Sequence, residues 1–146
     1  MSRVAAITSL LGSSSRLLLD AALDWHPATL PMRAPAVEQP AFLNRLLSQH
    51  GVDGTRRAAI ARAVRVLEQR PPSSNCSNRL LEVDWERGRD MPRTLFLKLP
   101  GEPLGTRFFC NAIRVWELEC LFFRNFAHDF PLRLPAVHAI ANQRSR

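Results

Sequence analysis

Two charged side chains stand in apolar stretches of the sequence and could act together as a chemical group. Lys98 lies in the apolar run of residues 94–99, and Glu119 lies further along the chain in a stretch rich in aromatic residues. Burying a charge is costly unless the charge is paired or bound to a ligand. A lysine and a glutamate in these positions therefore predict a salt bridge. An ammonium group held in place by a carboxylate is suited to binding an anion such as a phosphate.

Neither the histidines nor the cysteines show the spacing of a metal site. The histidines are His26, His50, His128 and His138. The cysteines are Cys76, Cys110 and Cys120. An odd number of cysteines without CxxC spacing predicts no disulfide framework. We interpret Cys110 and Cys120 as small core residues, and we expect a reducing, cytoplasmic location.

The composition indicates one domain with a core of its own. The chain has 146 residues, of which 46% are hydrophobic and 23% are charged, as is usual for globular proteins. No apolar run reaches the length of about 18 residues that predicts a membrane span, so we expect no membrane partner. The net charge of +7 comes from scattered arginines, and Lys98 is the only lysine. Because no basic run forms a nucleic-acid-binding arm, we expect no nucleic-acid partner.

Residues 1–40 are predicted to form an N-terminal helix and a linker. Residues 16–23 alternate charge and leucine as an amphipathic helix does, which favours a peripheral helix. A targeting segment is the alternative, because residues 4–11 form a short apolar run behind one positive charge. Prolines then exclude a regular helix from the linker. They are Pro27, Pro31, Pro35 and Pro40.

The next segment is predicted to hold further helices and a loop. Residues 41–50 place their large apolar side chains on one helical stripe, and Gly51 follows as a helix C-cap would. Residues 55–67 fit a helix and a strand equally well, because they mix alanine and arginine with valine and leucine. Residues 70–78 (RPPSSNCSN) are predicted as a loop.

Two strands then predict an antiparallel hairpin. Residues 80–85 and 94–99 alternate in the period of a half-buried strand, and turn-forming residues including Gly88 separate them. Lys98 shares one strand face with Thr94 and Phe96. We expect this face to be covered, so that the lysine lies among apolar neighbours.

One long helix is predicted over residues 106–127. Apolar residues at spacings of three and four define its core face. They are Phe109, Ala112, Ile113, Trp116, Cys120, Phe123 and Ala127. Glu119 borders this face, whereas Glu117 lies about 200° away and is expected to pair with Arg114. Residues 136–140 predict one more strand, and residues 141–146 a basic tail.

In this order the elements resemble the N-terminal lobe of a protein-kinase-like small-molecule phosphotransferase. The specific resemblance is to the aminoglycoside phosphotransferase and ecdysteroid-kinase-like family, whose lobes carry an "lfvK" strand, an "E-x-x-F-Y" helix and a "vP-x-v" strand. The matching residues here are 95–98 (LFLK), 119–123 (ECLFF) and 134–137 (LPAV). The resemblance covers residues 41–140. It implies an α+β fold with a small antiparallel sheet of three to five strands, one long packed helix and N-terminal helices.

The resemblance also implies a nucleotide site. Lys98 matches the family lysine that lies beside the α- and β-phosphates of ATP, and Glu119 matches the helix glutamate that holds this lysine in place. ATP with Mg²⁺ is therefore the implied cofactor. Residues 70–78 fall where the family's phosphate-covering loop lies. They contain no glycine, so Ser73, Ser74 and Ser77 are the candidate phosphate contacts.

The catalytic residues of the family have no counterpart in this sequence. A loop of the type H-x-D-x-x-x-x-N and a second, magnesium-binding aspartate are both missing. We therefore expect an incomplete domain, cut by truncation, frameshift or gene decay, that is inactive without a C-terminal lobe. That lobe is the expected partner, and a small-molecule substrate would bind only in a full-length enzyme. The alternatives are a non-catalytic interaction module with the same lobe and a basic nucleic-acid-binding domain.

Overall fold

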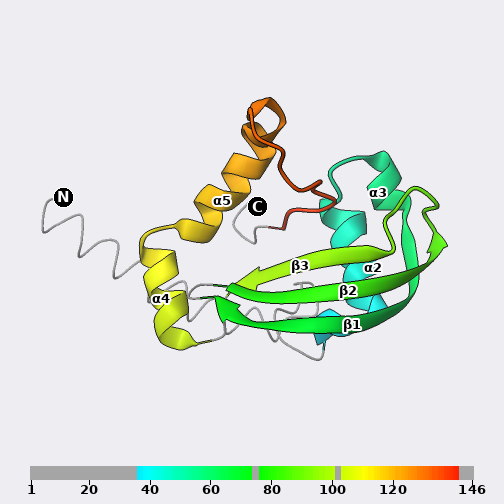
Figure 1. The fold of residues 1–146 in the computed structure, drawn as a ribbon, viewed down its shortest axis with the longest axis horizontal. Helices are drawn as coiled ribbons and strands as arrows, with labels where there is room; N and C mark the ends of the chain where they lie inside the picture. Colours follow the sequence, from blue (N-terminus) through cyan, green and yellow to red (C-terminus); the bar gives the residue numbers. More distant parts are fainter. Residues whose placement is uncertain (1–35, 74–75, 101–102, 142–146) are drawn as a thin grey trace, which may run out of the picture.

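The computed structural model describes residues 36–73, 76–100 and 103–141. The predicted N-terminal helix, most of the proline-rich linker, and residues 142–146 of the predicted tail lie outside these ranges. The elements are η1 (Ala36–Glu38), α2 (Pro40–His50), α3 (Gly54–Ala58), β1 (Ile60–Ser73), β2 (Cys76–Arg87), β3 (Thr94–Pro100), α4 (Leu104–Ala112), α5 (Val115–Asn125) and η2 (Ala127–Asp129) (Figure 1). The predicted α+β class is confirmed.

A three-stranded antiparallel sheet with the order β1-β2-β3 forms the centre of the fold. The predicted hairpin of β2 and β3 is confirmed, with Leu81 opposite Leu95 and Asn78 opposite Lys98. The prediction of a loop over residues 70–78 is wrong, because β1 continues to Ser73 and β2 already begins at Cys76. Prolines are tolerated in an edge strand, and β1 pairs with β2 alone in this sheet.

The ambiguous residues 55–67 are divided between a helix and a strand. Asp53 caps the short helix α3, and its carboxylate accepts a hydrogen bond of 2.9 Å from the backbone N–H of Arg56. This is the usual N-cap interaction. The chain becomes extended at Ala59, and β1 follows. Both readings of the sequence were therefore correct for part of the segment.

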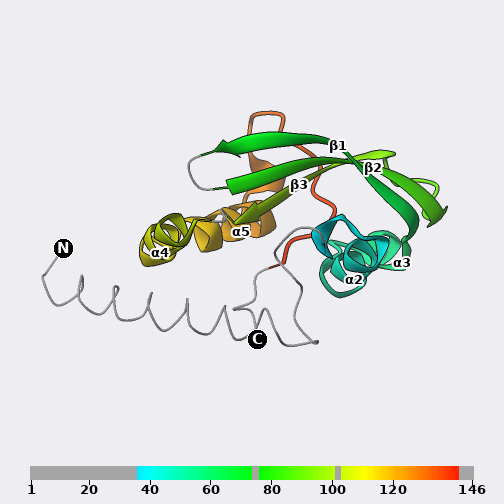
Figure 2. The same ribbon diagram turned by 90° about the horizontal axis from the view of Figure 1, so that it is seen from below.

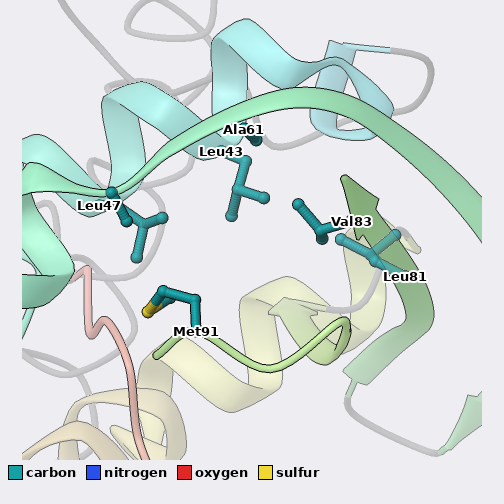
Figure 3. Close-up of a cluster of buried hydrophobic side chains, with 7 residues drawn as sticks. Leu43, Leu47, Ala61, Leu81, Val83 and Met91 are labelled. Atoms are coloured by element: carbon teal, nitrogen blue, oxygen red, sulfur yellow. The ribbon is translucent and has the colours of Figure 1, made fainter. Parts of the chain in front are cut away.

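The hydrophobic core lies between α2 and the sheet (Figure 2). Because strand side chains alternate between faces, Leu81 and Val83 of β2 point together toward Leu43 and Leu47 of α2 (Figure 3). A second buried cluster joins η1 to the end of β3. It consists of Val37, Phe42 and Leu99.

The prediction of one long helix over residues 106–127 is wrong. The chain forms two helices, α4 and α5, that change direction at Ile113 and Arg114 (Figure 1). Arg114 adopts the left-handed conformation with φ of 58°, which costs about 1 kcal/mol or more for a residue other than glycine. Its guanidinium group forms the expected salt bridge with Glu117 in the first turn of α5. This contact helps to hold the bend.

The two helices are also less buried than predicted. Phe109 is 61% exposed, Ile113 is exposed, and α5 contains no buried residue. Trp116 and Phe123, which were assigned to the core, are only half-buried. Cys110 is buried as predicted, whereas Cys120 is intermediate, and all three cysteines are free.

Residues 136–140 do not add a strand to the sheet. Instead, residues 138–140 lie beside the turn between α2 and α3, where Val52 N–H donates to the carbonyl of His138 at 3.1 Å. Gly51 forms an isolated bridge with Ala139 and caps α2, as predicted. A side chain at Gly51 would place its Cβ 2.6 Å from the carbonyl oxygen of Leu47. Close approach, rather than positive φ, therefore requires glycine here.

The position of His138 predicts a loss of stability at low pH. Burial is the main cause that lowers the pKa of His138, Arg56 lowers it further, and Asp53 opposes them. A histidine with a lowered pKa contributes its full stability above its ordinary value of about 6.5 and loses it as the pH falls. We expect the free energy of unfolding to fall as the pH drops below about 6.5. Urea unfolding across this range should show a smaller decline in His138→Gln than in the wild type.

An unchanged decline in His138→Gln would contradict the interpretation.

No helix in the described part of the chain is long and apolar enough to cross a membrane.

Candidate functional site

Lys98 lies on the sheet face that points away from α2. Its neighbours Leu97 and Leu99 in β3 turn toward the hydrophobic clusters, so Lys98 turns to the other side. The side chain of Lys98 is 44% exposed, and Phe96 on the same face is exposed as well. The expectation that this face is covered holds only in part, because Cys76 on the same face is buried whereas Phe96 is exposed. A half-exposed ammonium group can still be reached by a ligand.

Glu119 of α5 accepts a hydrogen bond from the Lys98 ammonium, and the two form a salt bridge. The predicted pairing is thus confirmed, and Glu117 does not compete because it binds Arg114. Salt bridges with this degree of exposure contribute no more than about 1 kcal/mol. The pair therefore matters more for orienting the lysine than for holding the fold together.

Two cysteines and a tryptophan surround the salt bridge and were not predicted as neighbours of Lys98. Cys76 interacts with Lys98, Glu119 and Trp116, and Cys120 interacts with Lys98. Cys76 stands two positions before Asn78, the partner of Lys98 in the ladder. Strand alternation from Lys98 would have identified Cys76, had β2 been predicted to start there.

Opposing effects act on the ionisation of Lys98. Burial favours the neutral amine, but the hydrogen bond with Glu119 and the interaction with the Cys76 sulfur outweigh it, so the pKa of Lys98 is raised. Burial is also the main influence on Cys76, and it raises the pKa of this thiol despite the nearby ammonium. At neutral pH the site therefore presents a cation beside a protonated thiol.

Among the three serines predicted as phosphate contacts, Ser77 is the one whose side chain the structure describes, and it does not face Lys98. Ser73 ends β1 and pairs with Cys76 in the ladder, so its backbone lies near the site. Ser74 is outside the described residues. Ser77 points toward α2, is buried, and accepts a hydrogen bond of 2.7 Å from Arg79 Nη1. Its hydroxyl is thus on the opposite face of the sheet from Lys98.

The fully buried charge in the described fold is Arg79 rather than Lys98. Its guanidinium group also donates to the backbone carbonyl of Asn78 at 3.2 Å and forms a salt bridge of 3.5 Å with Glu38 of η1. These contacts hold η1 against the sheet. The burial of Arg79 was not predicted from the sequence, because an arginine in an alternating strand ordinarily faces solvent.

The site suits a phosphate group better than a metal ion. Among residues 36–73, 76–100 and 103–141, no group of three or more histidine, cysteine, aspartate or glutamate side chains could hold a metal. Glu119 is engaged by Lys98. The Lys98 ammonium, in contrast, can donate hydrogen bonds to an anionic phosphate oxygen.

Comparison with models of known protein families, with curated proteins and with solved structures found no match to this chain. The geometry around Lys98 and Glu119 is therefore the basis for assigning a function.

Proposed function

We propose that this chain is the nucleotide-binding lobe of an ATP-dependent phosphotransferase of the aminoglycoside phosphotransferase and ecdysteroid-kinase-like kind, acting on a hydroxyl group of a small molecule. The observation that carries the proposal is the salt bridge between Lys98 on β3 and Glu119 on α5. The order of the elements supports the proposal as well. The strands β2 and β3 form an antiparallel hairpin, β3 contains the lysine, and α5, which contains the glutamate, follows.

Lys98 would bind the phosphates of the nucleotide. An ammonium group has three N–H donors, and the bond to Glu119 Oε1 uses one of them. Cys76 also interacts with the ammonium, so at least one donor remains for phosphate oxygens while Glu119 limits the motion of the side chain. Fixing the lysine in advance reduces the conformational entropy lost on binding.

The chain would bind a nucleotide without transferring its phosphate. Transfer needs an aspartate that accepts the proton of the hydroxyl group, together with a magnesium ligand. His128 and Asp129 contact each other at 2.9 Å, but both are exposed in η2, directly after α5. They do not form the family's H-x-D-x-x-x-x-N sequence. The missing groups would come from a C-terminal lobe.

We expect the 146-residue chain to bind ATP with a Kd of about 1 mM or weaker. One lobe supplies only one wall of a nucleotide cleft, so water continues to compete for the phosphates and the adenine. Isothermal titration with ATP and Mg²⁺ measures the affinity, and a coupled assay with hydroxyl substrates should show no transfer. Micromolar binding or measurable transfer would contradict the single-lobe assignment.

A second candidate function is a non-catalytic interaction module. Exposed aromatic side chains favour it, since large exposed apolar patches commonly mark sites of protein association. They are Phe96, Phe109, Phe126 and Phe130. A chain of this kind would keep the Lys98–Glu119 salt bridge but would show no binding of ATP at millimolar concentrations.

A further inference from the structure

Asn78 of β2 shares the outer face of the sheet with Lys98. Its neighbours Ser77 and Arg79 are buried on the side of α2 and η1, where their side chains join in a hydrogen bond. Because strand side chains alternate between the two faces, Asn78 points to the other side. The antiparallel ladder pairs it directly with Lys98 of β3.

The hydrogen-bond pattern of the ladder brings these two side chains close together. The backbone N–H of Val83 donates to the carbonyl of Arg93 at 2.7 Å, so residues 83 and 93 form a hydrogen-bonded pair. Such pairs alternate with pairs that exchange no hydrogen bonds, and the unshifted register makes Asn78 and Lys98 a pair of the second kind. Side chains are nearer to each other in these pairs, with Cβ atoms about 4.5–5.5 Å apart.

The Asn78–Lys98 pair lies at the border between a covered and an open part of this face. One step along the outer face, Cys76 is 4% exposed and pairs with Pro100. One step in the other direction, Leu80 pairs with Phe96, which is 54% exposed. A ligand that reaches the Lys98 ammonium from the open side therefore passes next to Asn78.

The amide of Asn78 is unfavourable for the fold in this position. Its Oδ1 is buried and accepts no hydrogen bond from the residues that the structure describes, and a buried acceptor without a partner destabilises the folded state. Asparagine is also depleted in strands, so an apolar side chain would suit β2 better. Residues that conflict with the fold in this way concentrate at functional sites, and this one lies opposite the only lysine of the chain.

The two ends of the amide differ in what they can contact. The burial of Oδ1 leaves Nδ2 as the end that can reach a ligand, since Asn78 as a whole is only half-buried. Nδ2 carries two N–H donors and no charge. Next to an ammonium group that is shared with Glu119, it offers a second, directed donor for an anion.

We infer that Asn78 is a phosphate-binding residue, whose Nδ2 donates a hydrogen bond to the phosphate chain that the Lys98 ammonium binds. This role rests on the proposed nucleotide-binding function, and it assigns to Asn78 the contact that was expected from the serines. Hydrogen bonds to a charged phosphate oxygen are stronger than those between neutral groups. The amide therefore favours the phosphate chain over the ribose and the base as its ligand.

NMR titration of the full chain at constant ionic strength tests the inference through the side-chain amide signals of asparagine. The Nδ2 signals of Asn78 should shift with tripolyphosphate and with ATP and Mg²⁺, but not with adenosine. Asn44 provides the internal control, because its amide bonds both the N–H and the carbonyl of Ala61, at 2.7 and 3.0 Å. Its signals should stay in place.

Asn78→Leu should weaken the binding of tripolyphosphate about tenfold, as expected when one hydrogen bond to a charged group is lost. The substitution leaves the charge of the chain unchanged and removes the unsatisfied acceptor, so the urea midpoint should stay the same or rise. Asn125→Leu is the matched control, because Asn125 is exposed at the end of α5. It should keep the wild-type affinity.

The outcomes separate the role of Asn78 from the proposed function. Shifts at Lys98 with ATP but none at the Asn78 amide would overturn the role of Asn78 and leave the nucleotide proposal standing. No shift at either residue would overturn both. An equal shift of the Asn78 amide with adenosine would show contact with the ribose or base instead. Loss of binding together with a lower urea midpoint in Asn78→Leu would also overturn the role, because Asn78 would then act through the fold.

Discussion

Leu81→Ala is expected to lower the free energy of unfolding by about 2–5 kcal/mol. Leu81 lies in the central strand β2, is 1% exposed, and packs in the cluster that joins α2 to the sheet (Figure 3). The substitution removes buried apolar surface and leaves a cavity that the neighbouring side chains fill only in part. Domains of this size are stable by roughly 5–15 kcal/mol. Urea unfolding followed by circular dichroism should show the loss directly.

Leu67→Ala provides the matched control for Leu81→Ala. Leu67 lies in the neighbouring strand β1 and is 46% exposed, so its replacement should change the stability by less than about 0.5 kcal/mol. Equal losses for the two variants would show that the core does not lie between α2 and the sheet.

Glu38→Gln is expected to destabilise the fold by about 1–3 kcal/mol. Glu38 pairs with Arg79, whose side chain is 2% exposed. Removing the carboxylate leaves a buried guanidinium group with less compensation for its lost hydration. The expected destabilisation is smaller than that for a fully buried salt bridge, because Glu38 itself is partly exposed. The same unfolding measurement provides the comparison with the wild type.

Glu119→Gln provides the contrast, because it breaks the half-exposed pair with Lys98. That substitution should cost less than about 1 kcal/mol. If Glu119→Gln destabilised the fold as much as Glu38→Gln does, burial would not be the factor that separates the two salt bridges.

The sequence predicted the hairpin and the Lys98–Glu119 pair because both depend on simple periodicity. Alternation in β2 and β3 places Leu81 and Leu97 on the core face and Lys98 on the other face. The position of Glu119 relative to Trp116 then directs the carboxylate toward the sheet. These relations hold even though the predicted ends of the strands were wrong.

The bend at Arg114 and the burial of Arg79 could not be predicted in the same way. The apolar spacing continues from α4 into α5 without a break. No proline or glycine near Arg114 marks the left-handed residue either. Periodicity identifies the apolar side of a helix but not what covers it, which is why Phe109 was assigned to the core. Arg79 is buried because η1 supplies Glu38 from a distant part of the chain.

The nucleotide proposal is tested most directly by NMR titration of the full chain with ATP and Mg²⁺, comparing the wild type with Lys98→Met and Arg89→Met. Both variants lose one positive charge, but Arg89 is exposed in the turn at the other end of the β2–β3 hairpin. The account predicts concentration-dependent shifts around Lys98 and Cys76 with a Kd of about 1 mM or weaker, kept in Arg89→Met and lost in Lys98→Met. Because the salt bridge contributes little stability, loss of binding in a folded Lys98→Met variant would report on the site itself. Equal chemical shift changes in the wild type and Lys98→Met would contradict the nucleotide proposal. The absence of any shift up to about 10 mM ATP would contradict it as well.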